Sequence, residues 1–167
     1  MDERGQLELP EHDLDPGDPV TSIALISLEG VLANGDDLRS AAVHRWTRPL
    51  YDGIRSQFRT VALTASDQTI ARGWLTRENL HGWTAVMSSS LSIMSYGDWK
   101  IDQIREFQAN GWEIAFLLDV DQAVTVVAQS MGVLTLTIGL PLHWPGWKAD
   151  DTSIRPWNEI SDTVETP

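Results

Sequence analysis

The sequence predicts an α/β fold: a three-layer α/β/α sandwich built around a mostly parallel sheet of about five strands. Short continuous apolar runs, typical of strands buried on both faces, alternate along the chain with segments of helical period. The 167 residues, of which 42% are hydrophobic, can form one core of ordinary size and are few for two. We therefore expect one α/β domain.

The first third of the expected domain contains a strand, a hairpin and a helix. Residues 22–27 form an apolar run that predicts a buried strand, and Asn34-Gly35 beyond it is a strong signal for a tight hairpin turn. A helix is expected to begin near Pro49, whose fixed φ suits the first helical turn. The apolar residues spaced by four on one face of this helix are Leu50, Ile54 and Phe58.

The middle third repeats the strand and helix pattern. Residues 59–64 predict a second buried strand, and Ser66 is placed to cap the helix that follows. Ile70 and Trp74 are the expected core face of that helix, and residues 84–88 are a weaker strand candidate.

The last third gives the clearest pattern. A helix is expected over about 101–109, ended by the Asn-Gly pair that follows it, with a strand over 113–118. Asp121 is placed to cap a further helix, and residues 133–138 predict the final strand. The expected core face of that helix consists of Val124, Val127, Ala128 and Met131.

The charge is concentrated in the two ends of the chain. The formal net charge is −12, of which residues 1–18 contribute seven acids and one Arg, and residues 149–167 contribute five acids and one Arg. The stretch 19–148, with 12 acids and 10 bases, is nearly neutral and lacks the basic surface that nucleic-acid backbones require. We therefore expect no nucleic-acid partner.

These compositional shifts suggest a division into three parts. We expect an acidic, flexible tail over 1–19, the α/β domain over 20–140, and an acidic segment rich in Trp and Pro over 141–167. That last segment contains Trp144 and Trp147 as well as Trp157, which are too many apolar rings for a free tail. Part of it is therefore expected to pack on the domain, on a protein partner or on a second copy.

Several classes of protein are excluded by what the sequence lacks. There is no Cys, which excludes a disulfide scaffold, a thiolate metal site and cysteine catalysis. No apolar run approaches the roughly 18 residues of a membrane helix, and the acidic start is unlike a secretory signal. We expect a cytoplasmic protein without a membrane partner.

Polar side chains follow three of the expected strands. In an open parallel sheet, ligands bind at the carboxyl ends of the strands. The polar residues there are, in chain order, Ser27 and Glu29, then Thr64 and Ser66, then Asp119 and Asp121. Lys100 precedes the expected helix that leads into the last of these strands.

This order of residues resembles the haloacid dehalogenase-like (HAD) superfamily, over roughly residues 22–139. The segments that carry the resemblance are Ser27-Leu28-Glu29-Gly30-Val31-Leu32, Ala62-Leu63-Thr64, Trp99-Lys100 and Leu118-Asp119-Val120-Asp121. The resemblance implies a Rossmannoid sandwich in which Thr64 and Lys100 bind phosphate and Asp119 and Asp121 bind a metal ion. The segments before Pro49 and before Lys100 are short, which leaves room for a hairpin flap and no cap domain. The excess of Arg over Lys fits a GC-rich source, such as a member of the actinobacteriophage type.

The first motif departs from the family pattern. Active members carry Asp-x-Asp, in which the first Asp is the nucleophile and a Mg²⁺ ligand and the second is the general acid and base. Here Ser27 and Glu29 stand at the two catalytic positions. A Ser hydroxyl without a neighbouring base is a poor nucleophile, and the substitution removes one hard oxygen ligand for Mg²⁺. We therefore expect no cofactor, and Mg²⁺ only if the protein is active.

For several of these residues the alternative is a purely structural role. Thr64 and Ser66 can simply cap a helix, and Lys100 can be a solvated surface residue. Helix capping is the favoured role of Asp121, whereas Asp119 at a strand end is favoured as a site residue.

The sequence thus supports three hypotheses of function. The first is a non-catalytic HAD-like domain that acts as a binding, structural or regulatory module, with a protein partner or self-association through the C-terminal Trp segment. The alternative is a divergent Mg²⁺-dependent phosphomonoesterase, using Glu29, Asp119 and Asp121 on an open-access or macromolecular substrate. A receiver-like domain ranks last, because the first strand ends in Ser27 rather than in an acid.

Overall fold

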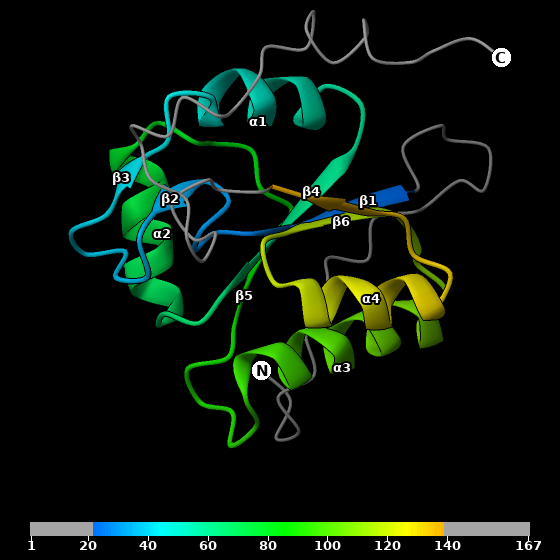
Figure 1. Cartoon of the computed structure of the whole chain (residues 1–167). Coiled ribbons are helices and arrows are strands. Elements are labelled where there is room, and N and C mark those ends of the chain that lie inside the picture. Colours follow the sequence, from blue (N-terminus) through cyan, green and yellow to red (C-terminus); the bar gives the residue numbers. More distant parts are fainter. Residues whose placement is uncertain (1–21, 139–167) are drawn as a thin grey trace, which may run out of the picture.

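A computed structural model of the chain describes residues 22–138 and consists of a twisted sheet with helices on both faces (Figure 1). The sheet has five strands in the order β5-β4-β1-β6-β7, and every neighbouring pair is parallel. The strands are β1 (Ser22–Ser27), β4 (Arg59–Thr64), β5 (Ala85–Ser88), β6 (Glu113–Asp119) and β7 (Thr135–Thr137). The predicted three-layer α/β architecture is confirmed.

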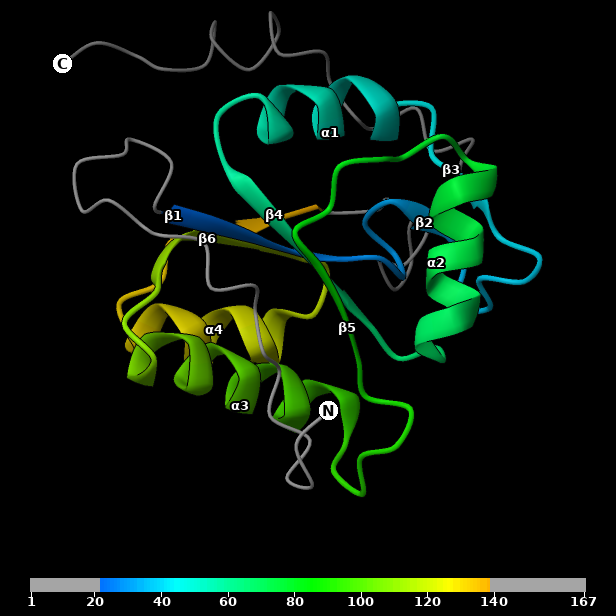
Figure 2. The same ribbon diagram turned by 180° about the vertical axis from the view of Figure 1, so that it is seen from behind.

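Two helices cover each face of the sheet. The helices α3 (Tyr96–Ala109) and α4 (Gln122–Ser130) lie together on one face, and α1 (Thr47–Arg55) and α2 (Gln68–Arg77) pack on the other (Figures 1 and 2). Strand β1 contributes to both cores, because Ala24 and Ile26 face α1 and α2 while Ile23 and Leu25 face α3 and α4. This double burial explains the continuous apolar run.

A small antiparallel hairpin follows β1, formed by β2 (Ala33–Asn34) and β3 (Ala42–Val43). The hairpin was expected, but the tight turn at Asn34-Gly35 is wrong, since Asn34 pairs with Ala42 across a longer loop. The physical reason is Leu38, which is fully buried in the core from within that loop.

Two helix starts differ from the sequence expectation. Helix α3 begins at Tyr96 rather than near Ile101, because the side chain of Ser95 caps it by accepting a hydrogen bond from the Asp98 amide. Lys100 therefore lies inside the helix and is buried. Helix α2 is capped by Asp67 and not by Ser66.

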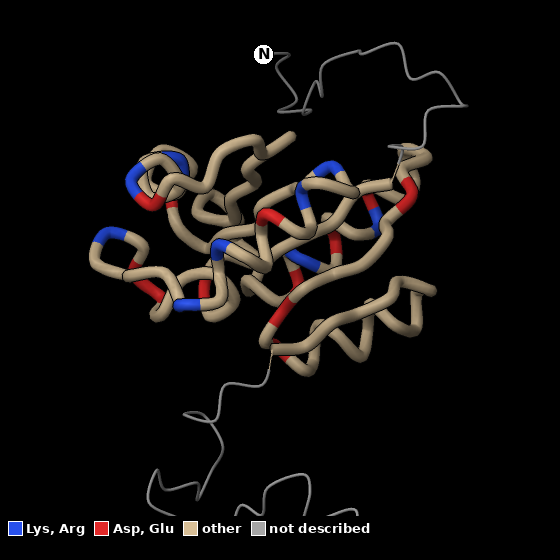
Figure 3. Tube along the Cα trace, turned by 90° about the horizontal axis from the view of Figure 1, so that it is seen from above, with Lys and Arg blue, Asp and Glu red and all other residues tan. Residues whose placement is uncertain are grey.

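Acidic and basic positions are interspersed along the described trace (Figure 3). Within residues 22–138, no helix is long and apolar enough to span a membrane. The predicted tail over 1–19 and the Trp segment over 141–167 lie outside the described residues.

Candidate functional site

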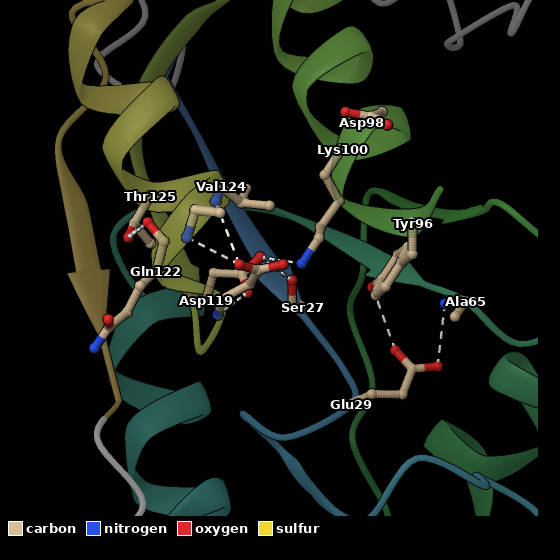
Figure 4. Close-up of polar contacts among 12 residues, drawn as sticks. Ser27, Glu29, Ala65, Tyr96, Asp98, Lys100, Asp119, Gln122, Val124 and Thr125 are labelled. Carbon is tan, nitrogen blue, oxygen red and sulfur yellow. Dashed lines mark hydrogen bonds and ion pairs between the residues drawn. The ribbon is translucent and has the colours of Figure 1, made fainter. Parts of the chain in front are cut away.

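The carboxyl ends of β1, β4 and β6 meet at one edge of the sheet and bring the predicted site residues together (Figure 4). After β1, the chain bends sharply at Gly30, whose φ is +78°. A Cβ atom at Gly30 would lie 2.8 Å from Cγ2 of Val120, so only glycine fits there. Before the bend, the Leu28 amide donates to the Leu63 carbonyl at 2.9 Å, which holds Glu29 beside the end of β4.

Ser27, Lys100 and Asp119 form a buried cluster. The Ser27 hydroxyl donates to Oδ2 of Asp119 at 2.7 Å, and Nζ of Lys100 lies 2.6 Å from the same oxygen. The side chains of Lys100 and Asp119 are only 3% and 0% exposed. The alternative in which Lys100 is a solvated surface residue is therefore wrong, and its charge is matched by one carboxylate.

The side chain of Asp121 forms hydrogen bonds with the backbone at the start of α4. Its Oδ1 accepts hydrogen bonds from the amides of Ala123 and Val124, at 2.9 and 3.4 Å, which makes it the N-cap of the helix. Its own amide donates to Oδ1 of Asp119 at 2.8 Å. The predicted capping role of Asp121 is confirmed, and the backbone at Asp121 also fixes the orientation of Asp119.

Glu29 is held by donors at the end of β4. Its Oε1 accepts a hydrogen bond from the Thr64 hydroxyl at 2.5 Å and from the amides of Ala65 and Ser66 at 3.2 and 3.3 Å. The Ser66 hydroxyl donates to the same oxygen at 3.2 Å. Thr64 and Ser66, both predicted at this edge, therefore bind an anionic oxygen that belongs to the chain itself. We call this group, Glu29 with Thr64, Ala65 and Ser66, the carboxylate cradle.

Tyr96 connects the cradle with the buried cluster and was not singled out from the sequence. Its hydroxyl donates to Oε2 of Glu29 at 3.3 Å, and Nζ of Lys100 lies 4.4 Å from the centre of its ring. Burial, followed by the negative charges of Glu29 and Asp119, raises the pKa of Tyr96 well above its ordinary value. The available signal was its spacing of four from Lys100, which places both side chains on one helix face.

The side chains at this edge do not fit a Mg²⁺ site as they lie. Mg²⁺ requires several oxygen ligands in octahedral geometry. One oxygen of Asp119 is taken by Lys100 and Ser27 and the other by a backbone amide, while Asp121 caps α4. Among residues 22–138, no group of three or more His, Cys, Asp or Glu side chains is arranged to hold a metal ion.

The arrangement also offers Ser27 little activation as a nucleophile. The side chain is buried, and its hydroxyl proton already points to Asp119. Of the two histidines in the described range, His81 lies near Asn79 and His44 stacks on Trp46. Neither is hydrogen-bonded to Ser27, whose acceptor is the Asp119 carboxylate, and the ion pair with Lys100 makes that carboxylate a weaker base.

Comparisons with known proteins identify the fold. No family model matches the sequence, and no curated protein matches it. A chain of the Pnkp1/Rnl/Hen1 RNA repair complex is similar over 80% of this chain, with a TM-score of 0.59 and 14% identity. This chain spans 46% of the length of that protein.

Two further solved structures are similar. A hydrolase of the haloacid dehalogenase-like family from Streptococcus pneumoniae has a TM-score of 0.55 and 14% identity, with 71% of this chain and 84% of that chain covered. A HAD family enzyme from Bacteroides thetaiotaomicron, in a magnesium complex, has a TM-score of 0.51 and 14% identity, with 76% and 97% covered. The chain has the haloacid dehalogenase-like fold. Identities this low establish the HAD fold alone, so its chemistry has to be argued from the site.

Proposed function

We propose that this protein is a HAD-fold domain that does not hydrolyse phosphoesters and acts as a binding or structural module. The observation that carries the proposal is the carboxylate cradle, in which four donors converge on one oxygen of Glu29. Converging hydroxyl and amide donors are the usual way in which a protein binds an anionic oxygen. Here the chain supplies that oxygen, so an external phosphate has to displace a side chain that is already well bound.

The charges in the buried cluster support the same proposal. Ser27 is neutral where the family pattern has a carboxylate, so Asp119 is the only acid hydrogen-bonded to Lys100 within the described residues. Within this cluster one cation and one anion balance, so the Asp119 carboxylate is already neutralised by Lys100 rather than available to Mg²⁺. The family's chemistry requires a nucleophile, a metal ion and an open anion site. Here the first acid is replaced by Ser27, the Asp119 carboxylate is paired with Lys100, and Glu29 fills the anion site.

A second candidate is a divergent Mg²⁺-dependent phosphomonoesterase that acts on an open-access or macromolecular substrate. The hydrolases among the structural neighbours favour it, and so does the meeting of Thr64, Lys100 and Asp119 at one sheet edge. In this candidate Glu29 leaves the cradle when substrate binds, and Asp119 contributes to a metal site formed only then.

An assay of aryl phosphate hydrolysis, with and without Mg²⁺, separates the two candidates. We expect the wild-type protein to release phosphate no faster than the matched variant Asp119→Asn. Metal-dependent release by the wild type that disappears in Asp119→Asn would overturn the proposal in favour of the phosphatase.

The double variant Ser27→Asp/Glu29→Asp serves as a second comparison. It restores both acids of the family's first motif and shortens the side chain that occupies the cradle. We expect it to bind Mg²⁺ more tightly than the wild type and to gain some hydrolysis. Measurable Mg²⁺-dependent hydrolysis by the wild type, at a rate equal to or above that of the double variant, would contradict the proposal.

A further inference from the structure

The sheet has one row of side chains that is buried on four strands and open on the fifth. The strand register places Val86, Ala62, Ile26, Leu118 and Leu136 side by side across β5, β4, β1, β6 and β7. Side chains paired in register across parallel strands point to the same face. The first four are at most 3% exposed, whereas Leu136 is 44% exposed.

The open part of this face belongs to the edge strand β7. Leu134, two residues before Leu136 and therefore on the same face, is 61% exposed. Helices α3 and α4 cover the opposite face, and α1 and α2 cover the other end of the sheet (Figures 1 and 2). Ile138 continues the same alternation, is partly buried against the core on this face, and ends the described range. We call Leu134, Leu136 and Ile138 the β7 apolar face.

We propose that the β7 apolar face is the docking site of the chain's own residues 140–144. The sequence there, Leu-Pro-Leu-His-Trp, alternates apolar and other residues, so an extended conformation puts Leu140, Leu142 and Trp144 on one side. Proline at positions 141 and 145 opposes a helix.

The position and length of this segment fit the surface. The described chain ends at Ile138, and Gly139 follows it as a residue at which the chain can turn back. Five extended residues reach roughly 16 Å, which exceeds the length of a three-residue strand. The acids of the C-terminal region begin at Asp150, beyond the apolar stretch. The docked segment therefore brings apolar side chains to an apolar face and leaves the acidic end in water.

The absence of Cys from the sequence allows a direct cross-linking test in the full-length chain. The test pair is Leu136→Cys with Leu142→Cys, treated with a short bis-maleimide that tolerates small differences in distance. The matched control is Thr137→Cys with Leu142→Cys, because Thr137 is exposed, adjacent in sequence and on the opposite face. Mass spectrometry and a denaturing gel distinguish cross-links within a chain from those between chains.

We expect the Leu136 pair to give an intramolecular product in at least several-fold higher yield than the Thr137 pair. Equal yields from both pairs would mean that the segment collides with either face at random, and would overturn the proposal. A covalent dimer as the main product would assign the face to a second copy, and no product would leave it to a separate partner. Either result also overturns the proposal.

Thermal unfolding provides an independent readout that does not depend on engineered cysteines. Trp144→Ala is expected to lower the Tm of the wild type and to have a much smaller effect in a Leu136→Ser background, because both changes remove the same contact. Additive shifts in Tm would contradict the docking. Both tests are independent of the proposed function, since none of the substituted residues belongs to the buried cluster or to the carboxylate cradle.

Discussion

The site at the carboxyl ends of the strands has two halves, the buried cluster and the carboxylate cradle, and each compensates its negative charge in a different way. In the buried cluster, the charge of Asp119 is matched by the opposite charge of Lys100, and both side chains are almost completely inaccessible. In the carboxylate cradle, Glu29 is matched by hydroxyls and backbone amides and lies nearer the surface. Loss of one partner of an ion pair leaves the other charge buried and unpaired, which costs much stability at once. Loss of one donor from a set of hydrogen bonds removes only part of the stabilisation. Under the proposed function, the first half opposes metal binding and the second opposes the binding of an external anion.

Removing the cation from the buried cluster is expected to have the largest effect. Lys100→Met leaves the Asp119 carboxylate buried with only the Ser27 hydroxyl and one amide as partners. We expect a loss of about 3–5 kcal/mol in the free energy of unfolding, as is typical when one member of a buried ion pair is removed. Urea unfolding followed by circular dichroism measures it.

The matched control for that variant removes both charges. In Lys100→Met/Asp119→Asn no unpaired charge remains, so most of the lost stability is expected to return. A double variant that is less stable than Lys100→Met would mean that the charge balance is not what holds this half together.

Emptying the carboxylate cradle is expected to have the next largest effect. Glu29→Ala leaves the Thr64 hydroxyl and the amides of Ala65 and Ser66 without their shared acceptor, which costs roughly 1–3 kcal/mol. Glu29→Gln keeps one acceptor oxygen and is expected to lose less. Chemical denaturation of both variants tests this order, and a Glu29→Gln variant that loses more than Glu29→Ala would contradict it.

Tyr96→Phe removes one hydrogen bond from the cradle and is expected to cost roughly 0.5–1.5 kcal/mol near pH 7. Because the pKa of Tyr96 is raised in the folded state, the unfolded chain loses this proton first as the pH rises above about 10. The contribution of the neutral Tyr96 phenol to the free energy of unfolding is therefore lost as the pH rises. The fall in stability between pH 9 and 11 should be shallower in Tyr96→Phe, and an unchanged slope would contradict the role of Tyr96.

His44 is expected to give the smallest effect, outside both halves. Burial lowers its pKa in the folded state, against weaker opposing contributions from the backbone oxygens of Gly30 and Ala33. The unfolded chain then binds the proton more readily, so stability falls as the pH drops below about 6.5. His44→Gln should therefore reduce the fall in the free energy of unfolding at acidic pH, which urea titrations at several pH values measure. An acid-side loss of stability that is the same in His44→Gln as in the wild type would contradict this contribution of His44.

The strands could be predicted because their signal is local. The apolar runs over 22–27 and 59–64 coincide with β1 and β4, since burial on both faces favours apolar residues at successive central positions of each strand. The meeting of Ser27, Thr64 and Asp119 at one edge followed from the parallel order of the strands.

The environment of the site residues could not be predicted, because it depends on contacts distant in sequence. Lys100 was expected before a helix, yet the cap at Ser95 extends α3 backward and turns Lys100 into the core. Glu29 was placed at the acid–base position of the family motif, and its binding by residues 35–37 positions later in the chain has no local signal. Ser66, expected as a helix cap, donates to Glu29 because Asp67 supplies the cap.

The most direct measurement is a titration of inorganic phosphate, in the presence of Mg²⁺, followed through the amide resonances of Ala65 and Ser66 by nuclear magnetic resonance. With Glu29 in the cradle, the wild-type amides should not shift at millimolar phosphate, whereas those of Glu29→Ala should shift and saturate. Saturable shifts in the wild type as large as those in Glu29→Ala would show that the cradle is open to external anions and would contradict its occupation by Glu29.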